Sequence, residues 1–185
     1  MSNPPETAIE KARNVRLVVM DVDGVMTDGR VLYAGPHEGV LFNVHDGTGI
    51  KYLHRCGIRT AIITGRQVDA VRVRAESLGI AHVVLGAKVK LDAYEAVLDA
   101  AQVADGAVAY VGDDLPDLPV MRRVGFAVAV PNAVPEVLDA ADWVTGRRGG
   151  EGAVREVAEF ILKAQGSWET ILQRYLDTTE TEQPA

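Results

Sequence analysis

Short runs of consecutive apolar residues alternate along the chain with longer segments of helical pattern. The apolar runs lie at positions 16–21, 59–64, 82–85, 107–111 and 126–130. Consecutive apolar positions are typical of strands that are buried on both faces, as in a parallel sheet. The segments of helix length between these runs are 47–56, 67–78, 90–101 and 115–124. The alternation predicts an α/β fold with a doubly wound, mostly parallel sheet.

The segment 24–46 breaks this alternation. It has no helical period, and it contains two strand-like runs on either side of Ala34-Gly35-Pro36. Turn-forming residues between two such runs are typical of a β-hairpin. We therefore expect a hairpin that is inserted after the first strand and projects beyond it.

A single domain accounts for most of the chain. A protein of 185 residues can bury roughly 70% of its unfolded surface, which is enough for one core. We expect an N-terminal extension at 1–14, one domain at 15–165, and a C-terminal helix with a disordered tail at 166–185. The last helix of the domain is predicted at 154–162, where apolar residues recur at i, i+3 and i+4.

Composition and charge exclude several kinds of partner. The chain has 26 acidic residues against 19 Lys and Arg, which gives a net charge of −7. An acidic chain repels nucleic-acid phosphates, and its apolar runs are far shorter than the ~20 residues that span a bilayer. Cys56 is the only cysteine, so no internal disulfide can form. We expect a cytoplasmic protein that binds neither nucleic acid nor membranes.

Polar residues follow the predicted strands at the end where an open α/β sheet binds its ligands. Asp21 and Asp23 follow the first strand, and Thr64, Gly65 and Arg66 follow the second. Lys88 and Lys90 follow the third strand, and Asp113, Asp114 and Asp117 follow the fourth. Carboxylates that gather at one edge are costly unless a cation neutralises them. Oxygen ligands with few neighbouring histidines suit Mg²⁺, which we expect as the cofactor.

The order and spacing of these residues resemble the haloacid dehalogenase superfamily of phosphatases. The motifs of that superfamily are DxD, a Ser or Thr, a Lys, and GDDxxD. They are matched here by Asp21-Val22-Asp23, Thr64, Lys90 and the segment 112–117. One DxD alone would be weak support, but four motifs in order, each at a strand end, are specific.

The chemistry of phosphoryl transfer assigns a role to each matched residue. Asp21 would attack phosphorus and form an aspartyl-phosphate, and Asp23 would act as general acid and then general base. Lys90 and Mg²⁺ would offset the repulsion between the two anions. The resemblance implies that the metal is held by Asp21, the backbone carbonyl of Asp23, and Asp113, with Asp114 beside them. Thr64 and the Gly65 amide would bind phosphate oxygens.

Some assignments remain open at this point. Lys88 competes with Lys90 for the lysine motif, and we favour Lys90 because it opens the helical pattern at 90–101. Asp117 could be a third acidic ligand, or its charge could interact with the dipole of the helix that it begins. His45, beside Asp46, is a candidate for lining the site.

The spacing of the motifs leaves no room for a cap domain. Only 40 residues separate Asp23 from Thr64, and 25 separate Thr64 from Lys90. These lengths accommodate the hairpin and the core helices. The enzyme is therefore predicted to be capless, so that it accepts exposed substrates or a neighbouring subunit closes its site.

The resemblance narrows to the 3-deoxy-D-manno-octulosonate 8-phosphate (KDO 8-phosphate) phosphatases. It is carried by DVDGVMTDG at 21–29, FNVHDGTGI at 42–50, AIITGR at 61–66, AYVGDDLPDLPV at 109–120 and GGEGAVREV at 149–157. It implies hydrolysis of KDO 8-phosphate to KDO and phosphate, a step of lipopolysaccharide biosynthesis. It also implies a homotetramer whose subunit contacts complete the sites.

Two departures leave the substrate open. That family commonly has Arg where this chain has His45 and Glu151, and the loss of two cations disfavours an anionic sugar acid. Arg66, Arg147 and Arg148 could compensate for this loss. A phosphatase of another sugar-acid phosphate, such as a nonulosonate 9-phosphate, is the alternative. A non-catalytic phospho-accepting regulatory domain is a further alternative, although its acceptor Asp would follow the third strand and not the first.

Overall fold

A six-stranded parallel sheet forms the centre of the molecule. The computed structural model describes residues 5–35 and 37–177. The strand order is β5-β4-β1-β6-β7-β8, and every neighbouring pair is parallel. The strands are β1 (Leu17–Met20), β4 (Arg59–Thr64), β5 (His82–Leu85), β6 (Val108–Gly112), β7 (Phe126–Ala129) and β8 (Trp143–Val144). The doubly wound α/β fold predicted from the sequence is confirmed.

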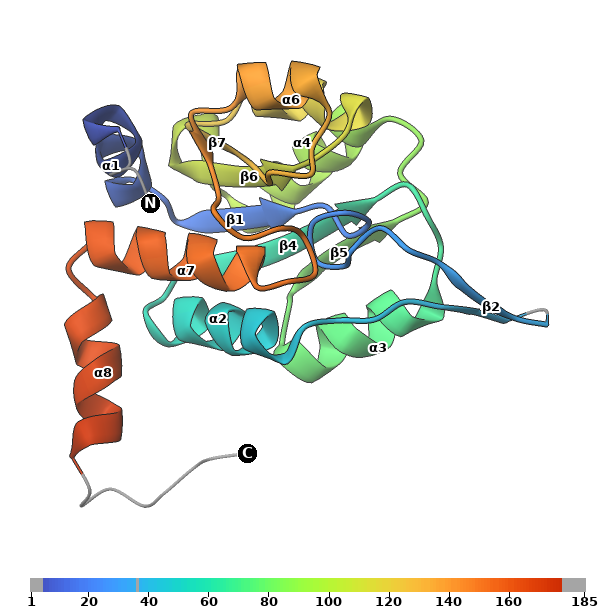
Figure 1. Ribbon diagram of the computed structural model, residues 1–185. Helices are drawn as coiled ribbons and strands as arrows, with labels where there is room; N and C mark the ends of the chain where they lie inside the picture. Colours follow the sequence, from blue (N-terminus) through green and yellow to red (C-terminus); the bar gives the residue numbers. More distant parts are fainter. Residues whose placement is uncertain (1–4, 36, 178–185) are drawn as a thin grey trace.

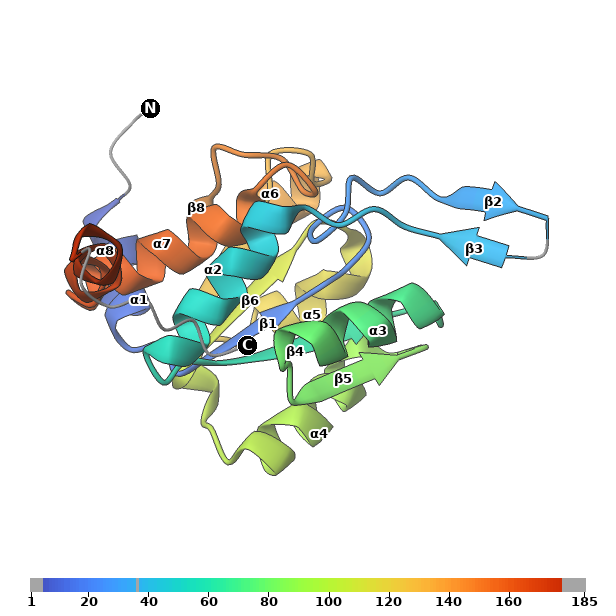
Figure 2. The same ribbon diagram turned by 90° about the horizontal axis from the view of Figure 1, so that it is seen from below.

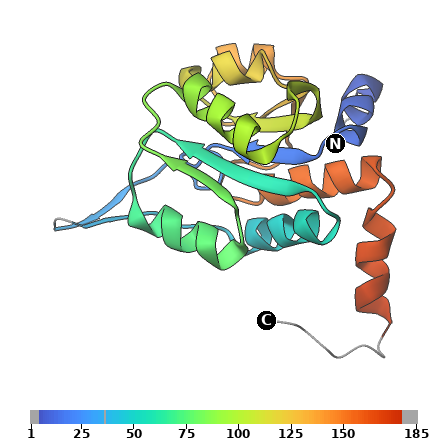
Figure 3. The same cartoon turned by 180° about the vertical axis from the view of Figure 1, so that it is seen from behind.

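Helices cover both faces of the sheet (Figures 1 and 3). One face packs against α2 (Val44–Arg55), α3 (Asp69–Leu78) and α7 (Ala153–Ala164), and α1 (Glu6–Arg13) packs against α7. The opposite face packs against α4 (Lys90–Ala101), α5 (Leu118–Met121) and α6 (Pro135–Ala140). The sheet is thus the middle of three layers, and the central strands β1, β6 and β7 are buried on both sides.

The consecutive apolar residues of β1 supply both halves of the core. Its four residues are all buried. Val18 and Met20 contact the layer that contains α2 and α7, whereas Leu17 and Val19 contact the layer that contains α4. Successive side chains of a strand point to opposite faces. A strand in the middle of three layers therefore needs apolar residues at every position.

The observed elements differ from the sequence expectations in three ways. The predicted helix 115–124 is a 3₁₀ turn, Leu115–Asp117, followed by the short α5. Helix α2 begins at Val44 and not at 47, because Asn43 accepts a hydrogen bond from the His45 amide (2.8 Å) and caps the helix. The short elements α1, α6 and β8 had no signal in the apolar pattern.

The predicted hairpin consists of β2 (Leu32–Ala34) and β3 (His37–Gly39), which pair antiparallel. It projects away from the sheet on the side of the carboxyl ends of the strands (Figure 2). Leu32 and Tyr33 are 62% and 67% exposed. Between β1 and α2 the described residues contain this hairpin and no cap domain, as predicted.

The last described helix, α8 (Trp168–Leu176), packs against α2 and α7. Trp168 and Tyr175 each make an edge-to-face contact with Tyr52, with centroids 6.0 and 6.1 Å apart. The predicted disordered tail extends into 178–185, which lie outside the described residues. The division into 1–14, 15–165 and 166–185 stays a prediction. Of the helices described, none is both long and apolar enough to cross a membrane.

Candidate active site

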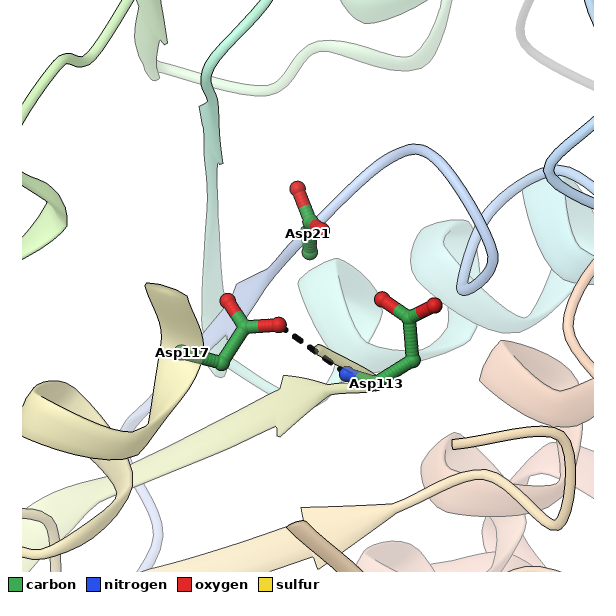
Figure 4. Close-up of side chains that lie close together, drawn as sticks. All are labelled: Asp21, Asp113 and Asp117. Atoms are coloured by element: carbon green, nitrogen blue, oxygen red, sulfur yellow. Dashed lines mark hydrogen bonds between the residues drawn. The ribbon is translucent and has the colours of Figure 1, made fainter. Parts of the chain in front are cut away.

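Three carboxylates meet at the carboxyl ends of β1 and β6. Asp21 follows β1, and Asp113 and Asp117 follow β6. One oxygen from each lies within 4.8 Å of the others (Figure 4). Asp21 is 6% exposed and Asp117 is completely buried. β1 and β6 are neighbours in the sheet, so residues far apart in the sequence are brought to one point.

Lys90 lies among these carboxylates at the first position of α4. Its Nζ is 2.9 Å from Asp21 Oδ2 and 2.6 Å from Asp117 Oδ1. Burial alone would lower the pKa of Lys90, but the two carboxylates raise it above its ordinary value, so the ammonium is charged. Lys88 is exposed. The structure therefore places Lys90, and not Lys88, in the cluster.

Asp117 is committed to hydrogen bonds within the protein. Its Oδ1 accepts from Lys90 and from the Tyr110 hydroxyl (2.6 Å for each), and its Oδ2 accepts from the amides of Asp113 (3.0 Å) and Asp114 (3.1 Å). These four bonds use the four acceptor sites of a carboxylate. The sequence left open a third metal ligand and a charge that interacts with the helix dipole, whereas these hydrogen bonds make Asp117 an anchor for the turn after β6.

Asp113, unlike Asp117, does not have all of its side-chain oxygens committed to hydrogen bonds within the described part of the chain. Burial, with the nearby charges of Asp21 and Asp117, raises the pKa of Asp113 to about 8. Burial likewise raises the pKa of Asp21 to about 6, although Lys90 opposes the shift. Asp113 Oδ1 is buried and has no hydrogen-bond partner among the described residues. A divalent cation would satisfy this oxygen and offset the charge, so Asp21 and Asp113 fit a hard cation such as Mg²⁺.

Gly24 shows how closely the loop after β1 approaches Asp113. A Cβ at Gly24 would overlap Asp113 Oδ2, and its φ of +88° lies in the left-handed region. Only glycine accommodates both conditions without strain. The DxDG segment is thus fixed against Asp113 by the backbone itself.

Asp23 pairs with Arg66 and not with the carboxylate cluster. Arg66 Nη1 lies 2.7 Å from Asp23 Oδ1, and its Nη2 lies 2.7 Å from Glu38 Oε2 on β3. Thr64 is 1% exposed, and its Oγ1 accepts from the Arg66 amide (3.2 Å). Gly65 is exposed at the end of β4. Thr64, Gly65 and Arg66 therefore border the site, and two carboxylates already neutralise Arg66.

Other predicted residues lie at the edge of the site. Asp114 is exposed and its side chain accepts from the Leu115 amide (2.8 Å), so the structure assigns it to the turn and not to the cluster. His45 is exposed in the first turn of α2, and no hydrogen bond to its ring occurs among the described residues. Glu151, Arg147 and Arg148 are exposed on the loop before α7.

Sequence reasoning did not identify Glu38 or Tyr110. Glu38 lies on β3 of the projecting hairpin, and its Oε2 accepts a hydrogen bond from Arg66 beyond the end of β4. Tyr110 lies inside an apolar run and reads as a core residue, although its hydroxyl supports Asp117. Neither position carries a local signal, because each role depends on packing between distant segments.

The fold and the site together define a haloacid dehalogenase-like hydrolase. The sequence model of the haloacid dehalogenase-like hydrolase family matches residues 47–125. The KDO 8-phosphate phosphatase KdsC of Escherichia coli K12 is 48% identical over 160 residues, or 85% of this chain and 85% of the relative. The chain belongs to the 3-deoxy-D-manno-octulosonate 8-phosphate phosphatase family.

Solved structures agree with this assignment. The KDO 8-phosphate phosphatase of Yersinia pestis superposes with a TM-score of 0.86 at 48% identity, over 89% of each chain. The enzyme of Moraxella catarrhalis superposes with a TM-score of 0.88 at 40% identity, over 91% of this chain and 97% of that chain. The Moraxella structure contains magnesium, phosphate and KDO.

Proposed function

We propose that the protein is a Mg²⁺-dependent phosphomonoesterase that hydrolyses KDO 8-phosphate to KDO and phosphate. The observation that carries the proposal is the cluster of buried Asp21 and Lys90 with partly buried Asp113 at the carboxyl ends of the strands. The names of the relatives support the substrate, and the ligands of the Moraxella structure support both the substrate and the metal.

Asp21 is the proposed nucleophile. Lys90 holds Oδ2, which leaves Oδ1 available to attack phosphorus and form an aspartyl-phosphate. With a pKa of about 6, the carboxylate is ionised at neutral pH. The Lys90 ammonium offsets the repulsion between this carboxylate and the substrate phosphate.

Asp21, the Asp23 carbonyl and Asp113 would hold the Mg²⁺ ion, and the unpartnered Asp113 oxygen is the strongest support for this assignment. Bound there, the cation would neutralise charge on the transferring phosphoryl group. Asp114, predicted as an additional ligand, would support these metal ligands indirectly, because its side chain caps the turn that follows Asp113.

Asp23 is the proposed general acid and base. It would protonate the departing sugar oxygen and then take a proton from the water that cleaves the aspartyl-phosphate. Thr64 and the Gly65 amide would bind phosphate oxygens, and Arg66 would contact the substrate with the N–H groups that Asp23 and Glu38 leave free. His45 stays a candidate for the sugar side of the site.

We further propose that the enzyme is a cytoplasmic homotetramer that serves lipopolysaccharide synthesis. The exposed apolar residues of the hairpin support an assembly, because Leu32 and Tyr33 expose apolar side chains on both faces of a projecting element. A capless site also favours closure by a neighbouring subunit.

The test is phosphate release from a panel of phosphorylated eight- and nine-carbon sugar acids, with Mg²⁺ and with a chelator. We expect the highest kcat/KM for KDO 8-phosphate, loss of activity with the chelator, and loss in Asp21→Asn. Asp28→Asn, a change of an exposed carboxylate in the same loop, is the matched control and should keep the wild-type rate. A preference for a nine-carbon acid would refute KDO 8-phosphate as the substrate, and full activity of Asp21→Asn would refute Asp21 as the nucleophile.

A further inference from the structure

We propose that Asn132 is a positioning residue that fixes the loop carrying Asp23 against the loop carrying Asp113. This inference rests on the proposed function, since it concerns the geometry of the same site. Asn132 lies beyond the end of β7, so a further strand end would take part in building the site.

Both polar groups of the Asn132 side chain bind backbone atoms of other loops. Its Nδ2 donates to the Gly24 carbonyl (2.8 Å), and its Oδ1 accepts from the Gly149 amide (2.8 Å). Hydrogen bonds of this length are well formed. Asn132 therefore joins the loop after β1 to the loop before α7.

Two glycines allow these loops to approach each other. A Cβ at Gly149 would overlap the Gly24 carbonyl, and a Cβ at Gly150 would overlap the backbone of Asp28. The Gly150 amide donates to the Val25 carbonyl (3.0 Å). The glycine-rich segment is therefore a backbone brace for the loop after β1, and the Asn132 side chain completes this brace.

The segment that contains Asn132 also contacts the loop after β6. The Val134 amide donates to the Asp113 carbonyl (2.9 Å), two residues after Asn132. One short segment thus contacts Gly24, which follows Asp23, and Asp113 itself. Because Gly24 lies directly against the Asp113 carboxylate, a displacement of one loop changes its spacing from the other.

This arrangement predicts a defect in the chemical step and not in the recognition of the sugar. A misplacement of about 1 Å in a reacting group can reduce a rate by about 100-fold. Both hydrogen bonds of the Asn132 side chain join backbone atoms, so its loss should affect all phosphate esters alike. A residue that binds the sugar would instead affect only the sugar-acid substrate.

The experiment compares Asn132→Ala with wild type, using KDO 8-phosphate and a small aryl phosphate as substrates. We expect kcat to fall about 10- to 100-fold for both, with each KM changed less than about 3-fold. Asn14→Ala, which removes a peripheral asparagine with one hydrogen bond (3.4 Å), is the matched control and should keep both constants. Wild-type kcat in a folded Asn132→Ala would overturn the proposal, as would a defect confined to KM or to one substrate.

Two further measurements remain informative if Asn132→Ala does not fold. Asn132→Ser retains a hydroxyl that can make one of the two bonds, and its kcat should fall less than that of Asn132→Ala. In wild type, amide hydrogen exchange at Gly149 and Gly150 should be as slow as in the sheet. Rapid exchange there would overturn the brace whatever the activity is. If the wild-type enzyme hydrolyses no phosphate ester, the proposed function fails, whereas the exchange result still decides whether the brace exists.

Discussion

At the scale of single residues, Asp113 and Asp117 illustrate how two neighbouring carboxylates acquire different roles. Asp117 has four hydrogen bonds and is completely buried, whereas Asp113 has a buried oxygen without a partner. Both were candidate ligands from the sequence, because spacing alone does not reveal which acceptor sites are filled. The hydrogen bonds assign Asp117 to structure and leave one oxygen of Asp113 available for the proposed cation.

Asp113→Asn should stabilise the metal-free protein and remove its response to Mg²⁺. Burial raises the folded-state pKa of Asp113 to about 8, so its contribution to stability is present at low pH and is lost as the pH rises toward 8. The variant avoids this loss. At pH 8 with a chelator we expect a higher melting temperature than in wild type, and Mg²⁺ should raise only the wild-type value. An equal Mg²⁺ shift in both proteins would contradict the assignment.

Asp46 gives a pH dependence that is separate from the site. It is 3% exposed and accepts a hydrogen bond from the Arg155 amide at the start of α7 (2.8 Å), and burial raises its pKa to about 6. The stability that it contributes is therefore present below pH 4 and is lost as the pH rises through 6. Asp46→Asn should match wild type near pH 4 and exceed it at pH 8.

Urea unfolding at several pH values measures this difference. The rise of the Asp46 pKa to about 6 corresponds to at most about 3 kcal/mol in the free energy of unfolding. Asp139→Asn, an exposed change on α6, is the control. A pH-independent difference between Asp46→Asn and wild type would show that the carboxyl group does not titrate in this way.

At the scale of elements, the sequence predicted the features that depend on local pattern. The central strands were recognisable because burial on both faces requires apolar residues at every position. The edge strand β8 and helix α6 were not, because two and six residues are too few for a periodic signal. Asn132 and Glu38 were missed for another reason: their partners belong to loops whose packing no local pattern encodes.

The hairpin contacts the site through the Glu38–Arg66 pair. Glu38→Gln removes one of the two carboxylates on Arg66, so we expect inorganic phosphate to inhibit more strongly. Because both side chains are partly exposed, the gain should be at most about 5-fold and should weaken in high salt. Glu136→Gln on α6 is the control. Unchanged inhibition constants would mean that Glu38 does not set the charge of Arg66.

At the scale of the whole molecule, the projecting hairpin is the feature that the fold of one chain does not explain. Its apolar residues Leu32 and Tyr33 remain mostly exposed, although the net charge of −7 otherwise favours dispersed molecules. The proposed tetramer would bury them. Light scattering should therefore give four chains for wild type and fewer for Leu32→Glu.

Leu176→Glu, at an exposed position on α8, is the control for that experiment. It should leave the assembly unchanged, since α8 lies at the opposite end of the molecule from the hairpin (Figure 2). A tetramer that persists in Leu32→Glu would exclude the hairpin as its contact.

The central claim is that Asp21 accepts the phosphoryl group, and mass spectrometry of acid-quenched enzyme tests it most directly. During turnover of KDO 8-phosphate, the peptide that contains Asp21 should carry one phosphoryl group, and this group should be absent from Asp21→Asn. Turnover without a phosphorylated peptide, or a phosphoryl group on another residue, would contradict the account.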